Sequence, residues 1–139
     1  MAHKYRIIIT DDDDDDRLLF KSVFDSNWRD CEITFAGDGV ELLDHLKNTH
    51  QLPSLIFLDL NMPRMDGFST LAELRSNPAF RSIPVIIITT SSLPEHITRC
   101  YQLGANSYLT KPSGYQQLTN LINQIRAFWF DTARIPART

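Results

Sequence analysis

The chain repeats one pattern five times: a short, mostly β-branched apolar run, a polar loop, and a segment whose apolar residues recur every three or four positions. Such runs are typical of strands buried on both faces, and such spacing is typical of amphipathic helices. Strands that alternate with helices across short links form a parallel sheet through right-handed crossovers. We therefore expect an α/β fold with a doubly wound, five-stranded parallel sheet and helices on both faces. The expected strands are residues 6–10, 32–36, 55–58, 85–88 and 107–110.

The composition favours a single globular domain. The 139 residues are 42% hydrophobic and 22% charged, and a chain of this length buries roughly two-thirds of its unfolded surface. We expect residues 1–130 to form one domain and residues 131–139 a short polar tail, with no output domain.

The distribution of charges, cysteines and apolar residues limits the partners and binding sites that this chain can have. The net charge is −3 and the 14 Lys and Arg are scattered, so there is no basic stripe of the kind that follows a nucleic-acid backbone. Cys31 and Cys100 have no zinc or disulfide spacing, and the four histidines, His3 among them, have no metal-binding spacing. No window approaches the roughly 18 apolar residues of a membrane span. We expect a cytoplasmic protein without a direct nucleic-acid partner or a membrane.

Charged or hydroxyl side chains follow four of the five runs directly. They are Asp11 and Asp12 after the first run, Asp59 after the third, Thr89 after the fourth and Lys111 after the fifth. The carboxyl ends of parallel strands meet at one edge, where open α/β sheets bind their ligands. We therefore expect these side chains to lie together.

This set of residues suits phosphoryl transfer. Carboxylates hold Mg²⁺, which needs only one or two of them besides its waters. The Asp59 carboxylate would attack a phosphoryl group in line and form an acyl phosphate, while the metal offsets the repulsion between the two anions. Lys111 would pair with one phosphoryl oxygen and the Thr89 hydroxyl would donate to another. Each residue alone also fits a salt bridge, a strand-end hydroxyl or a helix cap, so the prediction rests on their combination.

Six consecutive aspartates, Asp11 to Asp16, stand between the first strand and the first helix. Asp14 to Asp16 would cap that helix and suit its positive N-terminal dipole. Six residues cannot all be caps, and adjacent carboxylates repel one another unless they share a cation. Two interpretations of the loop stay open. In one, Asp11 and Asp12 bind a divalent metal; in the other, the loop is simply solvated.

With these residues in place, the chain resembles the CheY-like receiver domains of two-component signalling over residues 4–129. The motifs that carry the resemblance are Thr10-Asp11-Asp12, Leu58-Asp59-Leu60-Asn61-Met62-Pro63, Asp66-Gly67, Thr89, and Tyr108-Leu109-Thr110-Lys111-Pro112. The resemblance implies a flavodoxin-like strand order, 2-1-3-4-5. It also implies a stand-alone response regulator that accepts phosphate from a histidine kinase or a phosphotransfer protein and is not an enzyme beyond its own phosphorylation and dephosphorylation.

The same resemblance implies a role for each matching position. Asp59 is similar to the phosphoacceptor. Asp12 and Asp59 are similar to the carboxylate ligands of Mg²⁺, with the Asn61 carbonyl as a further ligand and Asp11 as a ligand through water. Lys111 and Thr89 would contact the phosphoryl group.

The resemblance also implies a switch. Thr89 and Tyr108 are similar to the family's switch pair, in which Tyr108 turns inward when Thr89 moves toward the phosphate. The Lys111–Pro112 peptide bond is similar to one that is usually cis in the family. The ending of the last helix, with Thr89 to Ser91, is similar to the regulators that are paired with bacterial phytochrome-type kinases. The effect of the additional carboxylates Asp13 to Asp16 on phosphodonor or metal binding stays open.

Two other functions fit parts of the pattern. An aspartate-nucleophile phosphatase has an Asp-x-Asp motif, but Asn61 stands where its general acid would be and cannot protonate a leaving group. A flavodoxin-like carrier would need a phosphate cradle in the first loop, which is acidic here.

Three aromatic residues in succession, Phe128, Trp129 and Phe130, end the last helix, and they cannot all face the core of a 3.6-residue helix. One interpretation buries two of them and leaves Phe130 on the surface. The other makes them an apolar patch for homodimerisation, or for docking a kinase, on the surface of the fourth helix, fifth strand and fifth helix.

Overall fold

One parallel sheet organises the fold, in the strand order β2-β1-β3-β4-β5, as expected. The computed structural model describes residues 5–136; His3 and the end of the expected tail, residues 137–139, lie outside that range. The strands are β1 (Tyr5–Thr10), β2 (Cys31–Ala36), β3 (Leu55–Leu58), β4 (Val85–Thr89) and β5 (Ser107–Thr110).

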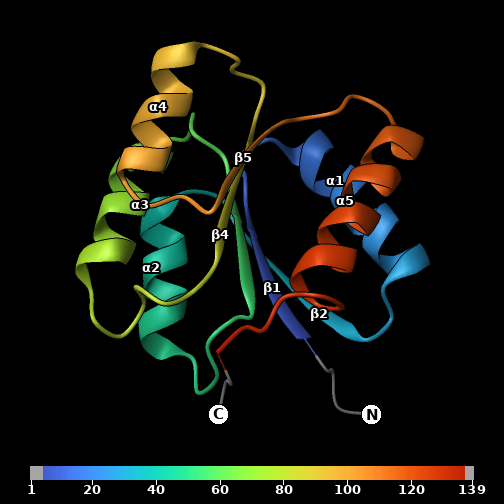
Figure 1. Cartoon of the computed structure of the whole chain (residues 1–139), viewed down its shortest axis with the longest axis horizontal. Helices are drawn as coiled ribbons and strands as arrows, with labels where there is room; N and C mark the ends of the chain where they lie inside the picture. Colours follow the sequence, from blue (N-terminus) through green and yellow to red (C-terminus); the bar gives the residue numbers. More distant parts are fainter. Residues whose placement is uncertain (1–4, 137–139) are drawn as a thin grey trace.

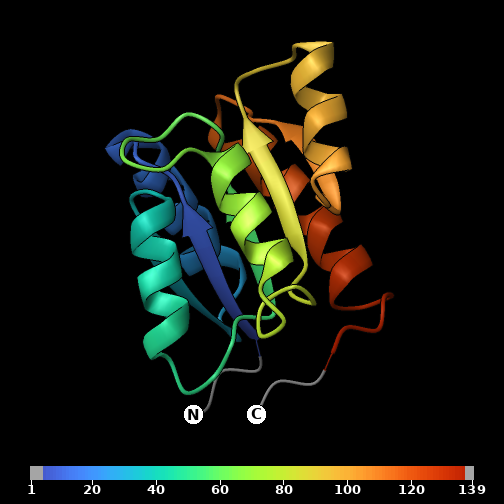
Figure 2. The same ribbon diagram turned by 90° about the vertical axis from the view of Figure 1, so that its left-hand side faces the viewer.

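Five helices cover both faces of this sheet (Figures 1 and 2). One face carries α1 (Asp14–Asn27) and α5 (Tyr115–Trp129). The other carries α2 (Gly39–Asn48), α3 (Gly67–Ser76) and α4 (Pro94–Gln102). The predicted doubly wound α/β fold is therefore confirmed.

Aspartate side chains cap the N-termini of three helices, α1, α2 and α3. Asp13, Asp38 and Asp66 each accept a hydrogen bond from a backbone N–H in the first turn of α1, α2 and α3. Such caps satisfy donors that have no partner within the helix. The cap of α1 is thus Asp13, one residue earlier than expected, and Asp14 to Asp16 form the acidic first turn.

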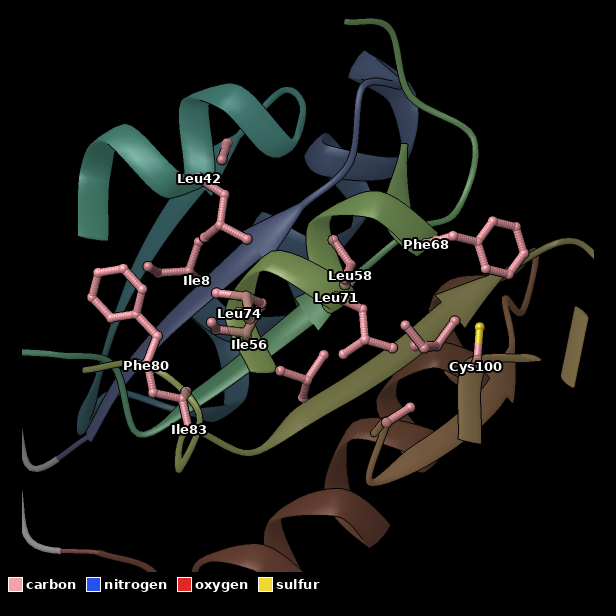
Figure 3. Packing of buried hydrophobic residues seen from close by; sticks show 14 of the residues in the cluster. Ile8, Leu42, Ile56, Leu58, Phe68, Leu71, Leu74, Phe80, Ile83 and Cys100 are labelled. Carbon is pink, nitrogen blue, oxygen red and sulfur yellow. The ribbon is translucent and has the colours of Figure 1, made fainter. Parts of the chain in front are cut away.

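Each face of the sheet has its own core. Alternate residues of β3 divide between them: Ile56 and Leu58 pack under α2, α3 and α4, whereas Leu55 and Phe57 pack under α1 and α5. Figure 3 shows the first core, in which Leu71 and Leu74 of α3 lie beside those β3 residues. All of β3 and β4 is buried, so the strands that carry Asp59 and Thr89 have little freedom to shift.

The carboxyl ends of the strands lie at one edge, at the top of Figure 1. Backbone hydrogen bonds extend the ladder one residue beyond the strands: Asp11 N donates to Ala36 O at 2.9 Å and Asp59 N to Thr10 O at 3.0 Å. Lys111 N donates to Thr89 O at 2.8 Å. The backbone of the candidate site is therefore fixed by the sheet itself.

Two expectations about local structure are wrong. No peptide bond within the described residues is cis, so Lys111–Pro112 is trans here. Phe130 does not lie free on the surface: it is partly buried at the end of α5, and its ring stacks on Tyr5 with the centroids 3.9 Å apart. Phe128 is the exposed aromatic, with 55% of its surface accessible.

Gly67 lies where α3 passes closest to the end of β3. A Cβ atom there would stand 2.3 Å from the Asp59 carbonyl oxygen, and that backbone cannot move without shifting the site. We expect Gly67→Ala to lower the free energy of unfolding by about 2 kcal/mol. Gly37→Ala is the matched control, because its Cβ would meet only the ends of long side chains, Glu41 Oε2 at 3.1 Å and Arg17 Nη1 at 3.7 Å. Urea unfolding of both variants checks this, and equal stabilities would contradict it.

Candidate functional site

A single ammonium group joins three carboxylates at the carboxyl edge of the sheet. Lys111 Nζ donates to Asp11 Oδ2 at 2.9 Å, and to Asp16 Oδ2 and Asp59 Oδ2 at 2.8 Å. The side chains of Lys111, Asp11 and Asp59 are only 8%, 3% and 10% exposed. An ammonium has three N–H donors, so these bonds use all of them.

The charges at this edge do not balance. Burial alone would lower the pKa of Lys111, but the three carboxylate hydrogen bonds outweigh burial and raise that pKa, so the ammonium stays charged. Burial raises the pKa of Asp11, and its hydrogen bond from Lys111 offsets only part of this effect. With Asp12 alongside, one cation faces four carboxylates, and a second cation would stabilise the group.

Asp11, Asp12 and Asp59 can offer that second cation a binding site. Each presents one carboxylate oxygen, and these atoms lie within 4.8 Å of one another. Two of the residues are buried and Asp12 is exposed, so the group opens to solvent on one side. Hard oxygen ligands of this kind suit Mg²⁺ or Mn²⁺. The donor set therefore fits the expected divalent metal.

Asn61 lies two residues after Asp59, in the loop between β3 and α3, and is exposed. Its backbone carbonyl is the remaining oxygen that the resemblance implied for the metal. That role stays a prediction.

Asp59 itself is held on both oxygens. The Leu60 N–H donates to Oδ1 at 2.7 Å, and Lys111 donates to Oδ2. A carboxylate held on both oxygens has a defined orientation. Such fixed orientation is what in-line attack on a bound group requires.

Thr89 and Tyr108 meet at the loop between β4 and α4. The buried Thr89 hydroxyl accepts a hydrogen bond from the Ser91 N–H at 3.5 Å, and the Tyr108 hydroxyl donates to the Ser91 carbonyl at 2.8 Å. Both hydroxyls thus bond to Ser91 in this loop, and the described hydrogen bonds do not join Thr89 to the carboxylates. The structure connects the expected switch pair through Ser91.

Two contacts were missed in the sequence. Asp16 reaches Lys111 from the first turn of α1, where the sequence predicts part of a helix cap. Ser91 Oγ also lies 2.7 Å from His96 Nδ1 of α4, which ties the switch loop to that helix. The sequence indicates a further role for the aspartates only through their number, which exceeds what a helix cap can use. Nothing in the sequence indicates the contact between Ser91 and His96.

Comparison with known proteins agrees with this geometry. The sequence model of the family "Response regulator receiver domain" matches residues 7–123 of this chain. The chain belongs to this family. It is 33% identical to the response regulator Rcp1 of Synechocystis sp. (strain ATCC 27184 / PCC 6803 / Kazusa), covering 96% of this chain and 94% of that protein.

Solved receiver structures superpose closely. The phosphorylated cyanobacterial phytochrome response regulator RcpA has a TM-score of 0.88 at 32% identity and covers 98% of this chain and 100% of its own. The Mn²⁺-bound form of Rcp1 has a TM-score of 0.85 at 32% identity and covers 96% of this chain and 99% of its own.

Membership in this family decides between the functions that the sequence left open. Receiver domains are phosphoacceptor proteins of two-component signalling; they bind a divalent metal at an acidic pocket and interact with histidine kinases or phosphotransfer proteins. The phosphatase and flavodoxin-like alternatives are not favoured. The roles of Asp59, Asp12, Asn61, Thr89 and Tyr108 stay predictions.

Lys111 offers a direct test of the charge balance at this edge. Lys111→Met leaves Asp11 and Asp59 buried without their ammonium, and removing one partner of a buried pair costs about 3–5 kcal/mol of unfolding free energy. The control is Lys21→Met, since Lys21 is 62% exposed and pairs with Asp25 on the surface of α1, where such pairs contribute about 0.5 kcal/mol. Denaturant unfolding in the presence of a metal chelator measures both, and similar losses would show that the buried pair is unimportant.

Proposed function

We propose that Asp59 accepts a phosphoryl group from a histidine kinase or a phosphotransfer protein, in a reaction that depends on Mg²⁺. The observation that supports this most is the placement of Asp59, whose Oδ2 atom is shared with Lys111 and lies within the metal-capable group of carboxylates. The receiver domain would comprise residues 1–130, and the reaction would take place in the cytoplasm without a direct nucleic-acid partner.

The chemistry follows from the groups around Asp59. A lone pair of Oδ2 attacks phosphorus, the bond from phosphorus to the donor's histidine nitrogen breaks, and that nitrogen keeps the electron pair. Leu60 N–H holds Oδ1 and so keeps Oδ2 aimed at the donor. Lys111 Nζ shifts its bond from Oδ2 to a phosphoryl oxygen. Bound Mg²⁺ supplies positive charge that offsets the repulsion between the two anions.

The only catalysis we propose is on the protein's own phosphate. Water attacks the phosphorus of the acyl phosphate, the bond from phosphorus to Asp59 Oδ2 breaks, and inorganic phosphate leaves. The Asp59 carboxylate is restored, so the signal ends without a second enzyme. Asn61 follows Asp59 by two residues and Ser91 follows Thr89 by two, and both would influence the rate at which water reaches the acyl phosphate.

Phosphorylation would reach the surface through the loop between β4 and α4. A phosphoryl group at Asp59 is a new acceptor for the Thr89 hydroxyl, which now accepts from Ser91 N–H. A move of Thr89 would change the position of Ser91, which the Tyr108 hydroxyl and His96 also contact. The output would therefore be a change at α4 and β5.

One solved relative that superposes well, RcpA, is a phytochrome response regulator. The ending of α5 and the Thr89 to Ser91 segment led to the same subgroup from the sequence. We propose a phytochrome-type histidine kinase as the phosphodonor of this chain.

Substitution of the acceptor tests the proposed function. Asp59→Asn keeps the shape of the side chain and removes the nucleophile, so we expect no phosphorylation with a small phosphodonor and Mg²⁺, whereas wild type gains the mass of one phosphoryl group. Asp25→Asn is the control, because Asp25 is an exposed aspartate on the surface of α1. Intact-mass spectrometry decides, and stable incorporation into Asp59→Asn would exclude Asp59 as the acceptor.

We also propose a phosphorylation-dependent homodimer through the α4, β5 and α5 surface. Phe128 stands exposed beside an apolar groove of about 190 Å³ between β5 and α5. A second copy that covers this groove in the active conformation would shift the population toward that conformation. The groove is lined by Ile86, Ser107, Leu109, Leu121, Gln124, Ile125, Phe128 and Trp129.

Two aromatic variants test the dimer. Light scattering with an acyl-phosphate mimic should give a dimeric mass for wild type and a monomeric mass for Phe128→Ala, because only the exposed ring is available to a partner. Phe130→Ala should still dimerise, since its ring stacks on Tyr5 within the same chain. A monomeric mass for all samples, with and without the mimic, would contradict the dimer and leave a monomeric docking module.

A further inference from the structure

Asp16 differs from the other two carboxylates that bind Lys111. Asp11 and Asp59 belong to the group of oxygens that can hold a metal, and Asp16 does not. It reaches Lys111 Nζ at 2.8 Å from the first turn of α1, with a side chain that is 30% exposed. Its bond to Lys111 therefore uses no oxygen of the metal-capable group.

The position of Asp16 is itself fixed by the loop. Its backbone N–H donates to Asp13 Oδ1 at 3.1 Å, and the Asp13 N–H donates to Asp11 Oδ1 at 2.9 Å. The cap of α1 thus connects the carboxylate of Asp16 to the end of β1. Asp16 can therefore act as a fixed anchor for the ammonium group of Lys111.

The proposed reaction weakens the bonds of Lys111 to its other two partners, Asp11 and Asp59. A metal draws on Asp11 and Asp59, and the attack on phosphorus turns Asp59 Oδ2 into the bridging oxygen of the acyl phosphate. A lysine has a flexible four-carbon stem and directs its charge well only where it is anchored. Asp16 is then the carboxylate that still holds Lys111 at the pocket.

We propose that Asp16 is a positioning residue for phosphoryl transfer, which anchors Lys111 while its bonds to Asp11 and Asp59 are redistributed. This inference rests on the proposed function. It assigns to one of the additional aspartates a role other than capping α1 or ligating the metal.

The negative charge of Asp16 has a separate and opposite effect. Any aspartate in this turn repels an anionic phosphodonor and raises the donor concentration needed for half-maximal rate. Asp15 is the matched control for this effect: it is the neighbouring residue, it is exposed, and it is not among the ion-pair partners of Lys111. A comparison of Asp16 with Asp15 variants separates anchoring from charge.

The experiment measures phosphorylation by acetyl phosphate at saturating Mg²⁺ over a range of donor concentrations. We expect Asp16→Ala to lower the maximal rate about tenfold, since misplacement of a catalytic group weakens transfer strongly. We expect Asp15→Ala to leave the maximal rate within about twofold of wild type and both variants to lower the half-saturating donor concentration. Asp16→Glu, which keeps a carboxylate on the same turn, should recover part of the maximal rate.

Metal binding gives a second readout. Asp16→Ala and Asp15→Ala should bind Mg²⁺ equally well, because neither residue is part of the metal-capable group. The isosteric Asp16→Asn replaces Asp16→Ala in both assays if the alanine variant does not fold.

Two results would overturn the inference while wild type is still phosphorylated. One is an equal maximal rate in Asp16→Ala and Asp15→Ala, which would reduce Asp16 to a surface charge. The other is a loss of Mg²⁺ affinity confined to the Asp16 variants, which would make Asp16 a metal ligand. Failure of the proposed function is distinct, since wild type would then take up no phosphoryl group.

Discussion

The ion-paired ammonium of Lys111 is the interaction on which this site depends. A parallel sheet brings the ends of its strands together, and here three of those ends carry buried or partly buried charge. Carboxylates so close to one another repel, and burial increases the cost of that repulsion. Lys111, which follows β5, bonds to the carboxylates of Asp11 and Asp59 at two of these strand ends. It also bonds to a third carboxylate, that of Asp16 in α1. The remaining excess of negative charge is what makes the site suitable for a metal and then for a phosphoryl group.

The fold keeps this strained arrangement in place. β3 and β4 are buried on both faces by two separate cores, and backbone bonds extend the ladder to Asp11, Asp59 and Lys111. Gly67 allows α3 to approach the Asp59 carbonyl closely. Under the proposed function, these rigid supports leave the loop after β4, where the Thr89 and Tyr108 hydroxyls both bond to Ser91, as the part of the site that would move.

Most of the fold and the convergence at the sheet edge could be predicted from the sequence, because strand and helix periodicities are local and parallel connections leave one topology. The contact between Asp16 and Lys111 could not, since it depends on how a helix start lies against a distant strand end. The exposure of Phe128 rather than Phe130 depends on how the end of α5 lies against Tyr5 of β1, a contact between distant residues that no local periodicity encodes. The isomer of the Lys111–Pro112 bond is likewise set by the surrounding structure and not by the two residues.

The measurement that tests the charge imbalance most directly is the stability of the protein as a function of Mg²⁺ concentration. If Asp11, Asp12 and Asp59 bind the metal in the folded state alone, the free energy of unfolding of wild type should rise with Mg²⁺, by about 2.7 kcal/mol at a hundred times the dissociation constant. Asp12→Ala should lose most of that rise, because it removes the exposed carboxylate of the group. A stability of wild type that does not change with Mg²⁺, or an equal rise in Asp12→Ala, would contradict the account.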